Sequence, residues 1–282
     1  MPFLSLSQAI GRHVRDGQSL ALEGFTHLIP FAAGHEIIRQ GRRRLRLIRM
    51  TPDLIYDQMI GMGCAEQLTF SWGGNPGVGS LHRLRDAVER QWPHALALTE
   101  RTHAEMGVAY KAGADGLPCG LMRSYAATDL DRAQAAPVAS FACPFTGERL
   151  RAVPALNPDV TILHAQQADR EGNVLIRGII GAAREAALAA RCLLVTVEEQ
   201  VERLAAPMNA VVLPHGLIAA VSIVPGGAHP SYAAGCYARD NRFYLEWDAI
   251  SRERARFTEW MREFVLASAD HAQLLRRLEV AA

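Results

Sequence analysis

Short apolar runs alternate with segments of helical periodicity through the first 120 residues of the chain. The runs typical of buried strands cover 19–22, 45–50, 68–72 and 95–99. Apolar residues recur every three or four positions in the segments 5–14, 31–40, 53–61, 81–91 and 103–113. This alternation predicts β-α-β units around an open, mostly parallel sheet, and therefore an α/β fold.

The second half of the chain repeats the pattern less regularly. Strands are expected at 160–163, 174–176, 193–197 and 218–224, and helices at 182–190, 251–266 and 271–278. The stretch from Thr128 to Pro158 is rich in Ala, Pro and Asp, which predicts a mobile or partner-facing excursion. No repeat or low-complexity linker divides the sequence, so residues 1–282 are expected to form a single domain.

Composition narrows the class of protein. Hydrophobic residues make up 49% of the chain, no run of about 18 apolar residues occurs, and we expect neither a membrane span nor a signal peptide. A net charge of +1 gives no field that would attract nucleic acid. The five cysteines lie far apart, as expected for free thiols in the cytoplasm. The ten histidines lack metal-site spacing, so no metal is expected.

Two glycine-rich loops follow predicted strands. Ligands of open α/β sheets bind beyond the carboxyl ends of the strands, where glycine lets the backbone approach them. The first loop runs from Glu23 to Pro30 and the second from Trp72 to Ser80. The second loop matches neither a P-loop nor a dinucleotide fingerprint. From the residues alone, each loop is either a substrate loop or a plain turn.

Other polar positions have structural explanations. Thr102 and Glu105 have the spacing of a capping box at the start of a helix. His164 follows an apolar strand and is interpreted as a bonded core histidine, whereas His229 is expected to order a turn. No G-x-S-x-G elbow occurs and no Ser-His-Asp order can be defended. Pattern alone therefore leads to an α/β domain with two glycine loops at strand ends.

Two longer segments carry a family resemblance. The segments 159–174, with Leu163-His-Ala-Gln-Gln-Ala168, and 225–231, with Gly227-Ala-His-Pro-Ser231, resemble the α subunit of family I coenzyme A (CoA) transferases of the glutaconate CoA-transferase kind. Shorter pieces agree in order and spacing along the whole chain: Ala21–Thr26, Glu36–Gly41, Asn75–Val78, Gly116–Pro118, Glu198–Glu199, Tyr237–Phe243 and Asp270–His271.

The resemblance implies a fold, a partner and a reaction. The fold would be that of CoA-transferases, related to ribose-5-phosphate isomerase, and the chain would pair with a β subunit, commonly as α2β2. A glutamate of the β subunit would attack an acyl-CoA thioester, the CoA thioester being a substrate and no cofactor being bound. The two glycine loops would form the α-side wall of the substrate and CoA site, through Gly24, Phe25, Thr26, Gly73, Gly74, Asn75 and Gly77.

Departures from the family pattern leave alternatives. The Glu-Asn-Gly nucleophile motif of β subunits is absent, and Pro76 stands where the glutaconate enzyme has a hydroxyl residue, which argues against glutaconate as the substrate. Some relatives instead hydrolyse a ring on a CoA-linked steroid fragment with an α-subunit glutamate, for which Glu100 is the best match and Glu105 a poorer one. A non-catalytic ligand-sensing module is a third interpretation of this fold.

One basic run is open to two interpretations. Arg42 to Arg46, together with Arg49, is expected to form a solvated turn before a strand. The functional alternative is contact with the phosphates of CoA or with an acidic partner surface.

Overall fold

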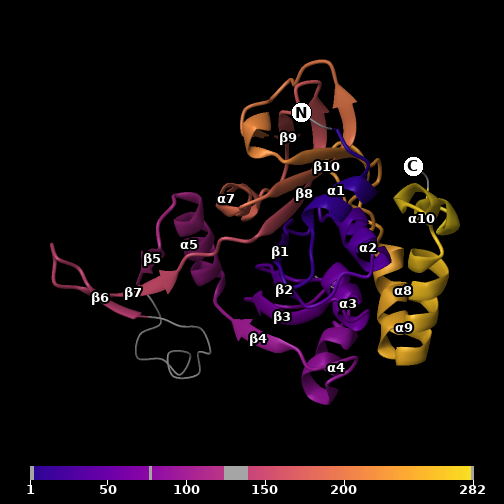
Figure 1. The fold of residues 1–282 in the computed structure, drawn as a ribbon, viewed down its shortest axis with the longest axis horizontal. Helices are drawn as coiled ribbons and strands as arrows, with labels where there is room; N and C mark the ends of the chain where they lie inside the picture. Colours follow the sequence, from indigo (N-terminus) through magenta and orange to yellow (C-terminus); the bar gives the residue numbers. More distant parts are fainter. Residues whose placement is uncertain (1–2, 76–77, 124–138, 281–282) are drawn as a thin grey trace.

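The structure is a computed structural model that describes residues 3–75, 78–123 and 139–280. A nine-stranded sheet forms its centre, and the strands that pair side by side run in the order β12, β10, β8, β1, β2, β3, β4 (Figure 1). All pairings along this path are parallel. These strands are β1 (Ser19–Leu22), β2 (Leu45–Ile48), β3 (Ala65–Phe70), β4 (Ala97–Glu100), β8 (Val160–Asp169), β10 (Leu193–Val201) and β12 (Ala220–Ile223). The predicted α/β class with a mostly parallel sheet is confirmed.

Two layers of helices cover the sheet. The helices are α1 (Leu6–His13), α2 (Phe31–Arg39), α3 (Leu54–Gly61), α4 (His82–Arg90), α5 (His103–Ala114), α7 (Ala183–Ala189), α8 (Asn241–Arg252), α9 (Arg254–Trp260) and α10 (His271–Arg277). A 3-10 turn (His215–Leu217) and a π-helical turn (Met261–Leu266) complete them. The predicted capping box of Thr102 and Glu105 starts α5, and a second box, of Ser5 and Gln8, starts α1.

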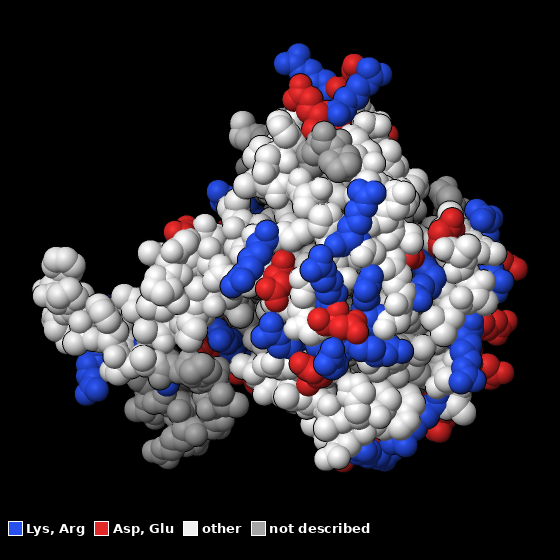
Figure 2. Space-filling model, in the orientation of Figure 1, with Lys and Arg blue, Asp and Glu red and all other residues white. Residues whose placement is uncertain are grey.

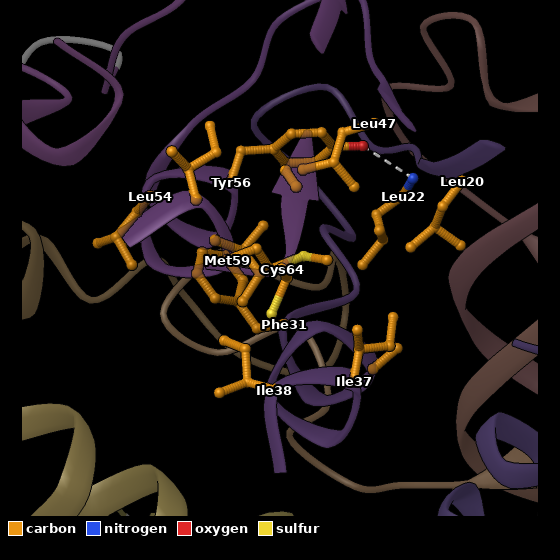
Figure 3. Close-up of a cluster of buried hydrophobic side chains, with 14 of the residues drawn as sticks. Leu20, Leu22, Phe31, Ile37, Ile38, Leu47, Leu54, Tyr56, Met59 and Cys64 are labelled. Carbon is orange, nitrogen blue, oxygen red and sulfur yellow. Dashed lines mark hydrogen bonds between the residues drawn. The ribbon is translucent and has the colours of Figure 1, made fainter. Parts of the chain in front are cut away.

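Side-chain alternation along β1 explains the two layers. Leu20 and Leu22 belong to the core built with α1, α2 and α3, whereas Ala21 faces the core built with α5 and α7. Figure 3 shows the first of these cores, where the Tyr56 hydroxyl also accepts the Leu22 N–H at 3.0 Å. Because both faces are covered there, β1 and the first halves of β8 and β10 read as nearly continuous apolar runs in the sequence.

Several predicted boundaries were wrong. We expected the strand from Val160 to end at Leu163, but β8 continues to Asp169, and β10 continues past Val197 to Val201. The polar half of β8 stays extended because it pairs with β10 on one side and with β9 (Val174–Ile176) on the other. β9 in turn pairs antiparallel with β11 (Val211–Leu213). Helix α8 was not predicted; its buried side is aromatic.

A small antiparallel sheet projects from the main body beyond α5 (Figure 1). It contains β5 (Cys119–Met122), β6 (Ala139–Ala142) and β7 (Arg149–Pro154), paired in the order β5, β7, β6. The predicted mobile or partner-facing excursion from Thr128 to Pro158 lies partly outside the described residues. Its described part forms two strands of this sheet, β6 and β7, whose residues are mostly exposed or half-buried, and its partner-facing role stays a prediction.

In Figure 2, acidic and basic side chains are interspersed over the centre, the right side and the top of this face, and neither sign forms a separate patch. No helix in the described ranges has the length and apolarity that crossing a membrane requires. Arg42, Arg43 and Arg44 lie in the predicted solvated turn before β2, whereas Arg46 is an exposed residue of β2 itself. Arg49 departs from that prediction because it is only 1% exposed.

Candidate active site

Four neighbouring strands end at one edge of the sheet, where polar residues gather. Glu23 follows β1, Met50 comes shortly after β2, Ser71 follows β3, and His103 comes shortly after β4. Adjacent parallel strands bring their carboxyl ends together, and this is the position at which open α/β sheets bind ligands. The carboxyl edge of β1–β4 is therefore the candidate site.

A chain of hydrogen bonds crosses this edge. The Tyr110 hydroxyl donates to Glu23 Oε1 at 2.7 Å, and the Met50 N–H donates to the same oxygen at 3.4 Å. The Met50 carbonyl accepts the Ser71 hydroxyl at 2.7 Å, and Ser71 Oγ lies 3.0 Å from His103 Nδ1. We call this set of contacts the Glu23–His103 relay. Through the N–H and the carbonyl of Met50 it connects a buried carboxyl group with an exposed imidazole.

Burial dominates the electrostatics of the inner end. Burial raises the pKa of Glu23 above its ordinary value, although the Arg49 guanidinium and the Tyr110 hydrogen bond oppose the shift. Burial likewise raises the pKa of Tyr110, and the neighbouring Glu23 carboxylate adds to that shift. The inner end of the relay therefore resists carrying a net negative charge.

Arg49 connects the first glycine loop to the start of helix α3. Its guanidinium donates to the Gly24 carbonyl at 2.7 Å and to Asp53 Oδ1 at 3.0 Å. Asp53 immediately precedes α3, so one buried cation joins the loop after β1 to the start of the helix after β2. This role was not predicted, because Arg49 stands next to a solvated basic run in the sequence and was grouped with it.

The first loop folds back on itself. A β-carbon on Gly24 would lie 2.7 Å from the His27 carbonyl oxygen and 2.8 Å from that of Leu28. The glycine is therefore required for packing within the loop, which is the plain-turn alternative. Phe25 and Thr26 are half-buried, and Thr26 has a positive φ of 57°. These three predicted binding residues lie together at the carboxyl edge.

The second loop lies at the same edge after β3. Trp72 is 47% exposed and Gly73 is exposed, whereas Gly74 and Asn75 are buried. A β-carbon on Gly74 would approach the Trp72 ring to 2.7 Å, so this glycine also makes room for a neighbour within the loop. Pro76 and Gly77, a predicted binding residue, lie outside the described residues.

The two candidate glutamates differ in exposure. Glu100 ends β4, is exposed, and pairs in register with Phe70. Glu105 is fully buried, and its carboxylate accepts the Thr102 N–H at 2.9 Å in the capping box. Of the two, Glu100 has the side chain that a ligand at the carboxyl edge could reach.

A second polar network, centred on Glu198, lies in the other half of the sheet. Glu198 of β10 accepts hydrogen bonds from His164 Nε2 at 2.6 Å, the Tyr237 hydroxyl at 2.6 Å and the Gly226 N–H at 2.7 Å. Burial opposes ionisation, but these donors hold the pKa of Glu198 below its ordinary value. The predicted core role of His164 is confirmed, since its side chain is fully buried.

The Glu198 network orders the segment that follows β12. A cavity of about 390 Å³ lies there, and residues that line it include Glu198, Gly226, Tyr237 and Leu275. His229 contacts Asp240 at 3.1 Å, in agreement with its predicted turn-ordering role. Within the described ranges, no cluster of three or more His, Cys, Asp or Glu side chains could hold a metal ion.

Comparison with known proteins identifies the family. The family model described as "Coenzyme A transferase" matches residues 3–223. The chain belongs to the coenzyme A transferase family. It is 58% identical to the A subunit of the 3-oxoadipate CoA-transferase of Pseudomonas knackmussii, over 98% of this chain and 97% of that protein. It is therefore a CoA-transferase subunit of the A type, and the resemblance noted in the sequence is confirmed.

Two further relatives share less sequence identity with this chain. The A subunit of the glutaconate CoA-transferase of Acidaminococcus fermentans is 32% identical over 98% of this chain and 91% of that protein. The solved glutaconate CoA-transferase of that organism superposes with a TM-score of 0.90, covering 99% of this chain and 93% of the other at 29% identity. The cholesterol ring-cleaving hydrolase IpdA subunit of Rhodococcus jostii is 23% identical over 96% of this chain and 94% of that protein.

Two residues of the edge, Ser71 and His103, were not predicted as site residues. Each was visible as a polar residue shortly after an apolar run, but Ser71 was assigned to the interior of a strand expected to reach Trp72. The shorter β3, which ends at Phe70, places Ser71 at the edge of the sheet instead.

Proposed function

We propose that this chain is the α subunit of a two-subunit CoA-transferase that moves CoA between an acyl-CoA and 3-oxoadipate or a closely similar 3-oxo dicarboxylic acid. The observation that carries the proposal is the 58% identity with the A subunit of a 3-oxoadipate CoA-transferase over nearly the whole of both chains. Pro76, which replaces a hydroxyl residue of the glutaconate enzyme, supports a substrate other than glutaconate.

The reaction would follow the ping-pong course of the family, with the nucleophile on the partner. A β-subunit glutamate attacks the thioester carbonyl, forming an acyl anhydride and releasing CoA thiolate. The thiolate then attacks the glutamyl carbonyl, which gives a glutamyl-CoA thioester and frees the first carboxylate. The acceptor carboxylate completes the exchange by the same two steps in reverse order. This chain carries no Glu-Asn-Gly nucleophile motif, in keeping with that division of labour.

In this proposal the carboxyl edge of β1–β4 is the α-side wall of the shared site. Gly24, Phe25 and Thr26 belong to the first loop, and Gly73, Gly74, Asn75 and Gly77 to the second. Trp72 offers an exposed apolar surface beside them. We further propose that residues 1–282 form one domain in an α2β2 assembly in the cytoplasm, where the five cysteines remain free thiols.

Co-purification and a transfer assay test the proposal. The chain co-expressed with its β subunit should form a hetero-oligomer that transfers CoA from an acyl-CoA donor to 3-oxoadipate. The chain alone should be inactive, and hydroxylamine or borohydride should trap a glutamyl-CoA thioester on the partner. Transfer by the single chain, or two unassociated species in size-exclusion chromatography, would refute the half-enzyme assignment.

Hydrolysis is the second candidate function. It is favoured by the exposed position of Glu100 at the carboxyl edge and by the match to the ring-cleaving hydrolase. A hydrolase would release CoA-linked product with water as the acceptor and leave no trapped glutamyl adduct. A ligand-sensing module would need no partner and would catalyse neither reaction.

A further inference from the structure

We propose that His103 recognises the second carboxylate of the dicarboxylic acyl group, and that Ser71 is the residue that positions its ring. This inference rests on the proposed function and adds to it the group of this chain that selects a dicarboxylic acid. A C6 dicarboxylate brings one carboxyl group to the reaction and must place the other in the site. Desolvating that second anion is costly unless a cation or strong donor meets it.

Four side chains in the described segments at the carboxyl edge can carry a positive charge, and burial excludes three of them as ligand contacts. In the described segments that follow β1–β4, at 23–30, 49–53, 71–75, 78–81 and 101–103, the Arg and His residues are His27, Arg49, Arg101 and His103. Three of these four are buried, at 0%, 1% and 7% exposure for His27, Arg49 and Arg101. Within these described segments, His103 is the exposed one.

The buried three already have partners. His27 Nδ1 lies 3.2 Å from the Ile179 carbonyl, and its Nε2 accepts the Ala234 N–H at 2.9 Å. Arg49 is held by Asp53 and the Gly24 carbonyl, and Arg101 donates to the Pro154 carbonyl at 3.4 Å. His103 Nε2 forms no hydrogen bond with any described residue.

The hydrogen bonds of Ser71 determine which nitrogen of His103 can bind a ligand. The Met50 carbonyl can only accept, so the 2.7 Å contact from Ser71 uses the single hydroxyl hydrogen of that serine. Ser71 Oγ must then accept from His103, which places a hydrogen on Nδ1. A carboxylate can bind at Nε2 only when that nitrogen also carries a proton, so the ring binds the anion as an imidazolium.

The Glu198 network contains the same arrangement with its carboxylate in place. His164 Nδ1 lies 2.8 Å from the Thr196 hydroxyl, and its Nε2 donates to the Glu198 carboxylate at 2.6 Å. In both cases a Ser or Thr hydroxyl holds Nδ1 of the histidine. In the buried case Nε2 binds a carboxylate of the protein, and at the open edge we assign the equivalent carboxylate to the substrate.

Neighbouring charges are compatible with this role. Glu100 is exposed on β4 and forms no ion pair with a described residue. Glu105 is buried in the capping box, and Arg101 is directed to a backbone carbonyl. The start of α5 favours a bound anion, which supports a carboxylate at this position.

The test compares two acceptors that differ only at the distal end. The assembled pair should be assayed with 3-oxoadipate and with 3-oxohexanoate, in which a methyl group replaces the second carboxylate. His103→Gln should raise KM for 3-oxoadipate by about 10- to 100-fold, the range of one charge-assisted hydrogen bond. The value of kcat should stay within about threefold, and KM for 3-oxohexanoate within about twofold, because that acceptor makes no such bond.

Three further variants separate recognition from structure. His103→Lys should recover part of the affinity for 3-oxoadipate by restoring a cation. Ser71→Ala should raise that KM by about 3- to 10-fold alone but add little in the His103→Gln background, because both act through one contact. His94→Gln is the matched control, since His94 is exposed just before β4, at its opposite end, and should leave both KM values unchanged.

Equal KM increases for the two acceptors, or no increase with His103→Gln, would overturn the assignment. Failure of the proposed function has a different signature, in which the parent pair transfers CoA to neither acceptor. In that event, the NMR chemical shifts of the histidine side-chain nitrogens, measured with adipate and with hexanoate as probes, still test carboxylate recognition. Adipate alone should shift His103 Nε2, and the absence of that shift would refute carboxylate recognition.

Discussion

Two histidines of this protein share one local arrangement but have different surroundings. His164 and His103 each direct Nδ1 to a hydroxyl group, of Thr196 and Ser71 respectively. His164 is fully buried and donates to Glu198, whereas His103 is exposed at the carboxyl edge. The contrast teaches that a polar network completed within the chain holds the fold together, whereas one that ends at the surface can bind a ligand.

The largest effect is expected where the network is complete. Glu198→Ala leaves three donors without their acceptor, and at about 1–3 kcal/mol for each buried donor left unpaired it should cost about 3 kcal/mol or more of unfolding free energy. Chemical denaturation measures this. Glu199→Ala is the matched control, because Glu199 lies next in β10 and accepts from the Gln167 amide at the surface. Equal losses for both variants would show that the Glu198 network is not a structural centre.

The second largest effect is expected at Gly24, in the first loop of the carboxyl edge. Gly24→Ala places a methyl group against two backbone carbonyls and should cost about 1–3 kcal/mol of stability. Gly11→Ala serves as control, since the nearest atom to its added β-carbon is 3.6 Å away. If Gly24→Ala left stability unchanged and only lowered turnover, the loop would be a ligand-approach loop rather than a packed turn.

A smaller effect distinguishes the carboxyl groups of Glu198 and Glu23 by the pH dependence of stability. The pKa of Glu198 is lowered, so its stabilising contribution is present above about pH 4.5 and is lost as the pH falls through its folded-state pKa. The pKa of Glu23 is raised, so its ionisation penalty is present at high pH and is relieved as the pH falls towards 4.5. Each group contributes at most about 1.4 kcal/mol per pH unit.

Unfolding free energies of the matched Gln variants measure this difference. Glu198→Gln should be less stable than the parent at neutral pH, with the deficit shrinking below pH 4.5. Glu23→Gln should gain on the parent as the pH rises. Slopes of the same sign for both variants would contradict the opposite assignments.

The smallest effect is expected at Glu100. If the partner supplies the nucleophile, Glu100→Gln should keep kcat/KM of the assembled pair within about threefold, since the amide preserves shape and exposed side chains contribute little. If Glu100 instead transfers a proton in hydrolysis, the loss should be about 100-fold or more. A folded but inactive variant, with no glutamyl adduct on the partner, would favour the hydrolase.

The sequence predicts the fold well where local periodicity decides it. Strands β1 and β2 and helices α2 and α5 follow their apolar patterns closely, because the central strands are covered on both faces. The polar half of β8 could not be recognised, since Gln166 and Gln167 stay in a strand only through pairing with distant segments. Helix α8 was missed because its buried positions, including Phe243 and Trp247, are spaced among charged residues.

The site was harder to predict than the fold. The two glycine loops were located from strand ends alone, but their glycines also satisfy packing needs that no sequence pattern reveals. The pairing of Ser71 with His103 depends on β3 and β4 being neighbours with a particular register. Arg49 looked like part of an exposed basic run because its burial depends on Gly24 and Asp53, which reach it only in the folded chain.

The position of β8 in the sheet has a consequence for synthesis of the chain. β1 lies between β2 and β8, and its Leu20 is in register with Val160, 140 positions later. Until that segment leaves the ribosome, about 7–28 s later at ordinary translation speeds, the nascent β1–β4 unit presents an apolar edge of Leu20, Ala21 and Leu22. We therefore expect the nascent chain to aggregate most readily before its second half is synthesised, whatever the stability of the complete fold.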